Sequence, residues 1–326
     1  MKRGLRGINL GGWLVVERWM TPDLFEGVEG SSEIDLVKQL GHEKAKKRLV
    51  HHRNTFITEE DFAWMAEHDI EVIRLPVGHW LFAQINGYIE GEEWVVRAFD
   101  WAEKYRLKII LDLHGLPGSQ NGKTHSGKSG KIEAYTLDNI QKTLDTIKHL
   151  AHFYGHKASL VAIELTNEPE WPTLGLRLWC YYRQAIKIVC KHADRDVKIV
   201  ISDGYSPYRA AFLCRLLPFR DRLVLDVHLY QIFTAEDRNK QADDYIEVVT
   251  VQWRMLIGRL SKHTPVMIGE WSAAIGTTLS HKEKFSKNYF QIQQQVFSDR
   301  TWAYCYWSYK APNSGIWDYK VAIEQQ

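Results

Sequence analysis

Short runs of apolar residues alternate with amphipathic segments along almost the whole chain. The apolar runs are rich in Ile, Val and Leu and lack an alternating polar face, which is typical of strands buried on both sides of a parallel sheet. They occupy residues 7–10, 71–77, 108–114, 160–168, 198–203, 223–230, 266–271 and 303–309. The segments between them carry apolar residues at helical spacing, most clearly in residues 91–106, 137–155, 176–192, 244–263 and 282–297.

This alternation predicts an α/β fold of the (β/α)8 TIM barrel type, built as a single domain over residues 1–326. Such barrels need ~250 residues, so the chain has a surplus for its loops. We assign the largest surplus to residues 28–58, which we expect to form an inserted loop and helical segment. The alternative architecture is a doubly wound sheet, which normally has fewer strands and a glycine-rich first turn.

The charge and cysteine content are those of an ordinary soluble protein. The 42 basic and 40 acidic side chains give no reason to expect a nucleic-acid or membrane partner, and the oligomeric state stays open. No apolar run reaches the ~18–20 residues that cross a bilayer. The first residues lack the features of a secretion signal, so we expect a cytoplasmic protein, or a secreted one if a leader has been removed. The four cysteines form no C-x-x-C pair, and we expect buried free thiols.

Residues 122–129, GKTHSGKS, match the phosphate-binding pattern G-x-x-x-x-G-K-[ST]. In a P-loop, Lys128 would contact a phosphate and Ser129 a magnesium ion. That chemistry requires a loop that leaves a strand directly and opens a helix whose amide groups face the anion. Here the motif begins eight residues after the predicted third strand, and helical spacing resumes only near residue 137. A nucleotide-binding protein is therefore the weaker alternative.

Polar side chains lie at the ends of the predicted strands, where the active sites of such barrels are found. They are Arg74, Asp112, His114, Asn167, Glu168, Asp203, His228, Tyr230, Glu270 and Trp307. Each of the two glutamates could cap a helix or pair with an arginine, but their occurrence after strands four and seven, with Asn167 directly before the first, favours catalysis. The two histidines, with Asp112 and Asp226, could also form a metal site, although neither has a typical zinc spacing.

Eight motifs occur in order between residues 6 and 310. They are RGINLGGWLVVE (6–17), TPDLFE (21–26), IRLPVGHW (73–80), LDLHGLPGSQNG (111–122), ELTNEP (164–169), DVHLYQIF (226–233), IGEWSAA (268–274) and YWSYK (306–310). Together they resemble glycoside hydrolase family 5, and within it the exo-β-1,3-glucanases of fungi. The order and span of the motifs make this resemblance far more specific than the tripeptide NEP alone.

The resemblance implies a retaining glycosidase in which Glu168 is the acid/base and Glu270 the nucleophile. The carboxyls of such pairs stand ~5–5.5 Å apart, so that one attacks the anomeric carbon while the other protonates the leaving oxygen. Arg74 would keep Glu270 ionised, and burial beside a negative neighbour would keep Glu168 protonated. The residues with an implied substrate-binding role are Glu17, Arg74, His114, Asn167, His228, Tyr230, Phe233 and Trp307. Among these, Tyr230 would hold Glu270, and Trp307 would form the floor under the reacting sugar.

The resemblance implies a β-glucan oligosaccharide or β-glucoside as the substrate, with neither cofactor nor metal. The sequence departs from the fungal pattern after GSQNG, where Lys123, Thr124 and His125 replace an aromatic residue, Asp and Asn. Because this loop resembles one that shapes the leaving-group side, the aglycone and linkage preference stay open. A carbohydrate-binding barrel without catalytic activity is the alternative from a different class.

Overall fold

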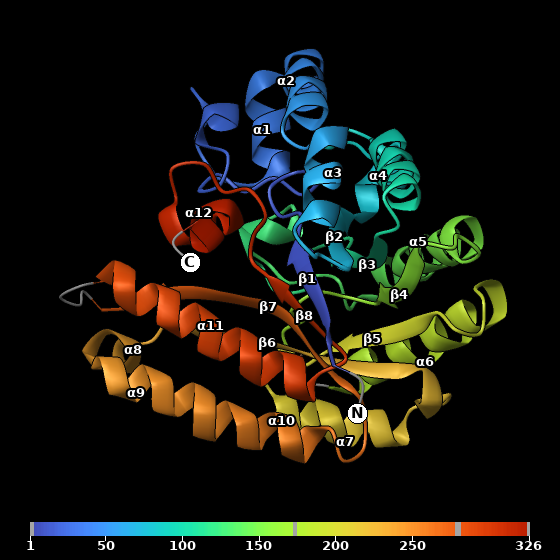
Figure 1. Cartoon of the computed structure of the whole chain (residues 1–326). Coiled ribbons are helices and arrows are strands. Elements are labelled where there is room, and N and C mark those ends of the chain that lie inside the picture. The colour runs from blue at the N-terminus through green and yellow to red at the C-terminus, as the bar shows by residue number, and fades with distance from the viewer. Residues whose placement is uncertain (1–2, 172–174, 278–281, 325–326) are drawn as a thin grey trace.

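The chain forms a closed barrel of eight parallel strands in sequence order, with the last strand paired to the first (Figure 1). The computed structural model describes residues 3–171, 175–277 and 282–324. The strands are β1 (Leu5–Asn9), β2 (Val72–Gly78), β3 (Lys108–Gly115), β4 (Leu160–Glu164), β5 (Lys198–Ser202), β6 (Leu223–Gln231), β7 (Val266–Ile275) and β8 (Ala303–Tyr306). The predicted TIM barrel is therefore confirmed, and the doubly wound alternative is wrong.

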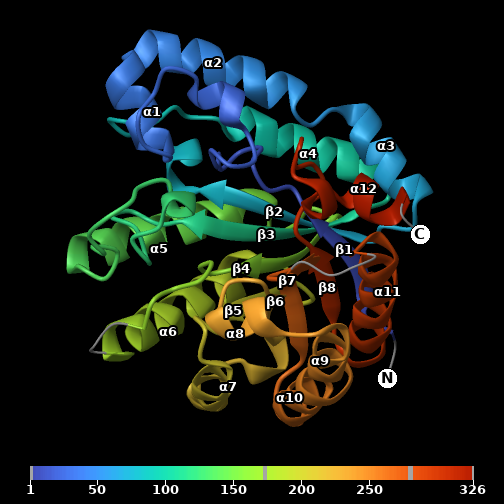
Figure 2. The ribbon, with the colours of Figure 1, turned by 90° about the vertical axis from the view of Figure 1, so that its left-hand side faces the viewer.

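Helices surround the sheet, as the two perpendicular views show (Figures 1 and 2). They are α1 (Glu33–Leu40), α2 (His42–Thr55), α3 (Glu59–Glu67), α4 (Glu92–Lys104), α5 (Leu137–Tyr154), α6 (Gly175–His192), α7 (Pro207–Leu216), α8 (Ala235–Asn239), α9 (Ala242–Glu247), α10 (Arg254–Leu260), α11 (Lys282–Arg300) and α12 (Tyr319–Glu324). Local chemistry sets some boundaries: the Thr136 hydroxyl accepts from the Asn139 amide and caps α5. The predicted helix over 244–263 is α9, a π-helical segment Val248–Trp253 and α10 in succession.

The barrel interior changes from apolar to charged along the strands. Its apolar layer consists of Val72, Ile110, Ala162, Val200, Val224, Met267, Ala303 and Cys305. Side chains two residues apart lie on the same face of a strand. The next inward residues are therefore Arg74 on β2, Asp112 on β3, Glu164 on β4 and Asp226 on β6, all with no exposed surface. The apolar layer thus supports a charged layer directly beneath the carboxyl ends of the strands.

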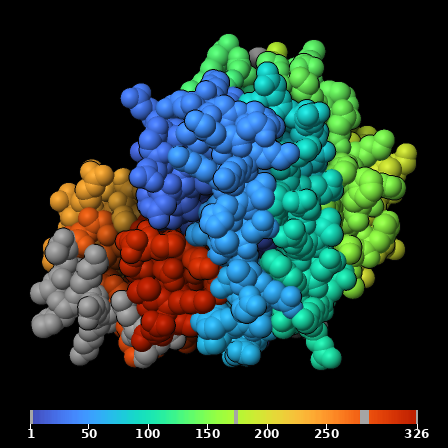
Figure 3. Space-filling model, turned by 90° about the horizontal axis from the view of Figure 1, so that it is seen from above, coloured from blue at the N-terminus to red at the C-terminus, as the bar shows by residue number. Residues whose placement is uncertain are grey.

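Residues 28–58 contain α1 and α2, which share a small apolar core outside the barrel. This core includes Leu36, Val37, Ala45 and Leu49. A buried ion pair between Arg53 and Glu33, 3.3 Å apart, holds the segment together. Viewed from above, the C-terminal segment lies against the N-terminal third of the chain (Figure 3).

The four cysteines are unpaired in the structure. Cys214 and Cys305 are buried, as expected, and Cys190 is partly buried. The expectation is wrong for Cys180, which is exposed because it lies on the outer side of α6. Within the described residues, no helix has both the length and the apolar character needed to span a membrane.

Candidate active site

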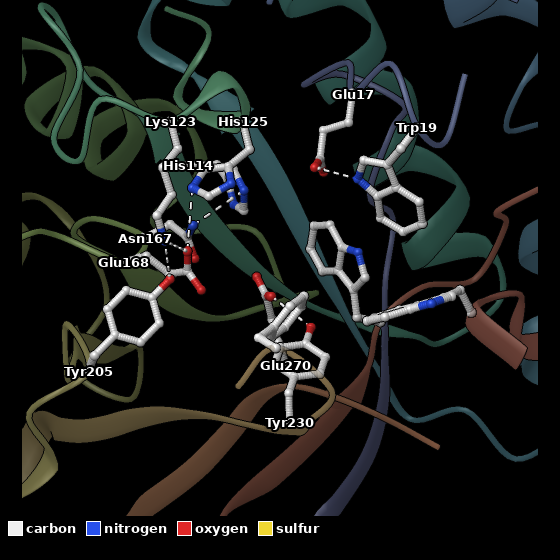
Figure 4. Close-up of a pocket in the computed structure, with 13 residues that line it drawn as sticks. Glu17, Trp19, His114, Lys123, His125, Asn167, Glu168, Tyr205, Tyr230 and Glu270 are labelled. Atoms are coloured by element: carbon white, nitrogen blue, oxygen red, sulfur yellow. Dashed lines mark hydrogen bonds and ion pairs between the residues drawn. The ribbon is translucent and has the colours of Figure 1, made fainter. Parts of the chain in front are cut away.

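A cavity of about 540 Å³ lies at the carboxyl ends of the strands (Figure 4). Its lining residues are Glu17, Trp19, His114, Lys123, His125, Asn167, Glu168, Tyr205, Tyr230, Phe233, Glu270, Trp307 and Trp317. The family resemblance implied two catalytic and eight substrate-binding residues, and eight of these ten are in this list. The other two, Arg74 and His228, lie behind the wall and contact the two glutamates from there. The structure therefore brings all ten residues together.

Arg74 is the centre of the charged layer beneath the cavity. Its guanidinium lies 3.0 Å from Asp112, 2.8 Å from Glu164 and 3.1 Å from Glu270. It also donates to the side-chain oxygens of Asn9 and Asn167. Burial lowers the pKa of Arg74, but the surrounding carboxylates outweigh it and hold the pKa well above its usual range. Arg74 therefore stays charged.

Glu270 extends from the middle of β7 and is held by two donors. Arg74 Nη1 donates to Oε1 at 3.1 Å, and the Tyr230 hydroxyl donates to Oε2 at 2.9 Å. Burial, followed by the charge of Glu270, raises the pKa of Tyr230 well above its usual range, so the hydroxyl keeps its proton. Both oxygens of Glu270 thus face fixed donors, which hold the carboxyl group in one direction.

Glu168 lies in a strained turn beyond the end of β4. The strand stops at Glu164, earlier than predicted, and Glu168 has φ +40°, a value that few residues other than glycine adopt. Its backbone is held on both sides: the amide donates to Ser202 Oγ at 3.2 Å, and the carbonyl accepts from Asn121 Nδ2 at 3.1 Å. Strain of this kind is common where a side chain must be presented to a reacting group.

His228 lies between Glu168 and the charged layer. Its Nδ1 is 2.9 Å from Glu168 Oε1, and its Nε2 is 3.1 Å from Asp226 Oδ2. Burial lowers the pKa of His228, but the charges of Glu270 and Asp226 outweigh burial and raise it well above the usual value. Both ring nitrogens therefore carry protons, and the imidazolium donates to one carboxylate on each side.

The same contact changes the protonation expected for Glu168. Burial raises its pKa, but the hydrogen bond and charge of His228 outweigh burial, and the net pKa lies well below the usual range. The expectation that burial keeps Glu168 protonated is therefore wrong. The proton of the Glu168–His228 pair is on His228.

The two glutamates are close enough to act on one substrate atom. One carboxylate oxygen of Glu168, one of Glu270 and a ring nitrogen of His228 all lie within 4.8 Å of one another. Retaining glycosidases have carboxyl groups ~5–5.5 Å apart, whereas inverting enzymes need ~6.5–9.5 Å to admit a water molecule. The approach of these two oxygens fits the retaining geometry.

Aromatic side chains form the wall opposite Glu168. Trp307 stacks on His114 with their ring centres 5.8 Å apart, and Trp317 lies 5.7 Å from Tyr230 and 6.4 Å from Phe233. Such faces suit the apolar C–H surfaces of a sugar ring. Trp317 was not indicated by the sequence, because it lies in the C-terminal segment and only the fold brings it to the cavity.

Glu17 adds a third carboxyl to the cavity. Trp19 Nε1 donates to Glu17 Oε2 at 2.9 Å, and burial raises the pKa of Glu17 to about 7. Near neutral pH this side chain therefore alternates between a proton donor and an acceptor. That property suits the recognition of sugar hydroxyls, which both donate and accept. Trp19 itself was missed, since a loop residue two positions after Glu17 has no periodic signal.

The loop after β3 lies against the outer oxygen of Glu168. Oε2 is 3.4 Å from His125 Nε2 and 3.8 Å from Lys123 Nζ, and Lys123 also donates to the Tyr205 hydroxyl at 2.7 Å. Burial lowers the pKa of His125 to about 4, so this ring is neutral at neutral pH. Tyr205, which was missed, follows β5 and could have been found as a strand-end residue.

The same loop rules out the P-loop. Residues Thr124–Ser126 form a single 3₁₀ turn, and the next α-helix begins only at Leu137. Lys128 pairs with Glu133 at 2.9 Å and lines a different cavity from the one that holds the two glutamates. No strand leads directly into a helix at this motif, so the phosphate-binding geometry is not formed.

The alternative metal site competes with Arg74. Within the described residues, two triads could offer metal ligands, Glu164 with Asp226 and His228, and Glu168 with His228 and Glu270. The Arg74 guanidinium already contacts Glu164 and Glu270 and lies 3.9 Å from Asp226. It supplies the positive charge that these carboxylates require, and the protonated His228 has no free lone pair. The geometry is therefore that of a network centred on arginine.

Comparison with known proteins identifies the family. The family model described as Cellulase (glycosyl hydrolase family 5) matches residues 38–313. The chain belongs to glycoside hydrolase family 5. It is therefore a glycoside hydrolase enzyme, and the family resemblance of its motifs is confirmed.

Several proteins in this family resemble the chain over most of its length. Glucan 1,3-beta-glucosidase 1 of Schizosaccharomyces pombe is 35% identical over 300 residues, which cover 88% of this chain and 72% of the relative. A probable glucan 1,3-beta-glucosidase A of Emericella nidulans is 36% identical over 282 residues, covering 83% and 67%. The crystal structure of a rutinosidase from Aspergillus niger superposes with a TM-score of 0.83 over 100% of this chain and 97% of that chain. At 21% identity, this last match shows the shared fold.

Proposed function

We propose that this family 5 enzyme is an exo-acting β-glucosidase that cleaves β-1,3-glucan or related β-glucosides with retention of configuration. The observation that carries the proposal is the pair of glutamates, of which one oxygen each lies within 4.8 Å of the other and of a ring nitrogen of His228. The two relatives above, both described as glucan 1,3-beta-glucosidases, support glucose as the released sugar.

In the first step of the proposed reaction, Glu270 attacks the anomeric carbon and the glycosidic bond breaks. His228 passes its proton to Glu168 through the 2.9 Å contact, and Glu168 gives it to the leaving oxygen, which leaves Glu168 a carboxylate and His228 neutral. The charge of Glu270 is a main cause of the high pKa of His228. Bonding to the sugar removes that charge, so His228 becomes a stronger acid as Glu168 loses its proton.

In the second step, Glu168 acts as the base that activates water. Water attacks the anomeric carbon from the side that the leaving group has vacated, and Glu270 is released as a carboxylate. Arg74 and Tyr230 then stabilise its restored charge through the hydrogen bonds already in place. We assign Asn167 to the sugar 2-OH, because its side chain is fixed by a 2.7 Å bond from Arg74.

The remaining cavity residues divide the substrate between two sides. Since Glu168 protonates the leaving oxygen, the aglycone lies toward Lys123, His125 and Tyr205. The glucose unit lies over Trp307, with Glu17 and His114 as partners for its hydroxyls. Phe233 stands at the rim, where 66% of its surface is exposed and free to contact an aglycone.

Product analysis tests the proposal. The protein is incubated with β-1,3-gluco-oligosaccharides and with an aryl β-glucoside, and proton NMR follows the first turnovers. We expect glucose to appear first as the β anomer and to equilibrate later. Release of the α anomer would contradict retention, and products larger than glucose would contradict exo action. A folded protein that binds the oligosaccharide without hydrolysing either compound would instead support the non-catalytic binding barrel.

A further inference from the structure

Helix α7 exposes a continuous apolar stripe to solvent. Tyr208, Phe212 and Leu216 follow one another at four-residue spacing, and they are 57%, 60% and 56% exposed. Phe219, just beyond the helix, is 49% exposed. The opposite side of the same helix is also apolar, and its residues Ala210, Leu213 and Cys214 are buried. A helix that is apolar on both sides is normally covered on both sides. The outer side of α7 therefore fits a partner with an apolar surface.

The surface around this stripe is basic. Residues 204–220 and 248–264 contain no Asp or Glu, and the exposed Asp221 follows the first stretch directly. Their exposed basic side chains are Arg209, Arg215, Arg220, Arg254, Arg259 and Lys262. The second stretch includes α10, which lies beside α7 in both views (Figures 1 and 2) and in the contacts between helices. It adds two more exposed apolar residues, Val251 and Met255. The near-neutral charge of the whole chain conceals this local basic face.

We infer that the face formed by α7, α10 and residues 217–220 docks on an anionic lipid surface. Apolar side chains that enter the boundary between headgroups and acyl chains, with arginines around them, are the two elements of interfacial binding. Anionic headgroups attract such arginines over about one Debye length. The apolar stripe and the basic residues would thus both contact the same lipid surface.

A second copy of the chain and a neutral glucan each account for only one of the two features. In a symmetric dimer this face would meet itself, so arginines would face arginines with no acidic residue between them in either stretch. A neutral glucan could stack on Tyr208 and Phe212, but it has no charge to pair with Arg215 and Arg220. An anionic lipid surface satisfies both.

The face begins at the rim of the catalytic cavity. Tyr205 lines that cavity beside Glu168, is 55% exposed, and precedes α7 by two residues. Docking would therefore bring the leaving-group side of the cavity toward the lipid. It follows that β-glucosides with a lipid aglycone are a suitable substrate class. This extension rests on the proposed function, whereas the docking itself does not.

Vesicle sedimentation tests the docking without any need for turnover. The purified protein is mixed with vesicles of phosphatidylcholine alone or with added phosphatidylglycerol. We expect it to sediment with the anionic vesicles, and roughly tenfold more weakly with the neutral ones or at high salt. The double variants Phe212→Ser/Leu216→Ser and Arg215→Glu/Arg220→Glu should each bind roughly tenfold more weakly than the wild type.

Phe153→Ser is the matched control, because Phe153 is equally exposed at 60% but lies on α5, away from the basic face. It should bind like the wild type. All variants should keep the wild-type melting temperature and hydrolyse a soluble aryl glucoside at the same rate. The inference is overturned if the wild type ignores anionic vesicles or if the α7 double variant binds them undiminished. It is also overturned if that variant instead dissociates a dimer in ultracentrifugation or loses retention on insoluble β-1,3-glucan.

Discussion

Arg74 Nη1 donates to Glu270 Oε1 at 3.1 Å, from a side chain that is fully buried among four carboxylates. This contact joins the stability of the barrel to the charge of the proposed nucleophile. We expect Arg74→Met to lower the free energy of unfolding by about 3–5 kcal/mol, because buried carboxylates would lose their counter-charge. The variant should also lose most of its glycosidase activity. Chemical denaturation and assay of an aryl glucoside measure the two effects.

Arg53→Met is the control for this prediction. Arg53 is also buried, but it pairs with Glu33 in the segment outside the barrel. Its replacement should destabilise the protein while leaving KM and kcat of the folded fraction near the wild-type values. An Arg74 variant that keeps full activity, or one that is as stable as the wild type, would contradict the central role of this arginine.

Glu270 should be dispensable for folding and essential for turnover. When Glu270 is replaced by alanine, Arg74 keeps Asp112, Glu164 and Asp226 as partners, so no buried charge is left alone. We therefore expect Glu270→Ala to melt within a few degrees of the wild type but to lose activity by several orders of magnitude. Tyr230→Phe, which removes one donor to Glu270, should lower kcat by about 10²-fold. Near-normal turnover by folded Glu270→Ala would exclude it as the nucleophile.

The barrel could be predicted because its signals are local. Buried parallel strands are apolar throughout, and their polar end residues must lie together once the barrel closes. That reasoning located Glu270, His114, Tyr230 and Trp307 from strand positions alone. It could not locate Trp19 or Trp317, because they reach the cavity from loops whose paths depend on tertiary packing.

The protonation of Glu168 could not be predicted either. It depends on which ring nitrogen of His228 approaches which carboxylate, and the sequence contains no such distances. The left-handed backbone of Glu168, held by Ser202 and Asn121, is likewise a product of the assembled loops. The string GKTHSGKS could be set aside from the sequence, because a phosphate site needs a helix directly after the glycines and none was predicted there.

The pH dependence of activity should reveal the shared proton. In the wild type, the alkaline limb of kcat/KM reports loss of the proton from the Glu168–His228 pair, and the raised pKa of His228 places it above the usual histidine range. In His228→Gln, Glu168 alone holds the proton. Because a carboxyl group is a stronger acid than this imidazolium, we expect the alkaline limb to move to lower pH.

A dinitrophenyl glucoside provides the control, because its leaving group needs no proton. Its formation of the glycosyl enzyme, followed as a burst of dinitrophenolate, should lack this alkaline limb in both the wild type and His228→Gln. If the limb for an ordinary aryl glucoside instead moves to higher pH in His228→Gln, then Glu168 carries its own proton in the wild type and His228 only opposes it.

The last prediction separates the roles of the two glutamates. If Glu168 is the acid/base, Glu168→Ala should still transfer glucose to Glu270 from a dinitrophenyl glucoside. The covalent intermediate should then accumulate, because no base activates water. Azide needs no deprotonation, so it should restore turnover and give the β-glucosyl azide by a second inversion at the anomeric carbon. Proton NMR of the product decides the assignment. An α-azide would mean direct attack on the substrate and would identify Glu168 as the nucleophile, whereas fast turnover without azide would show that another group is the base.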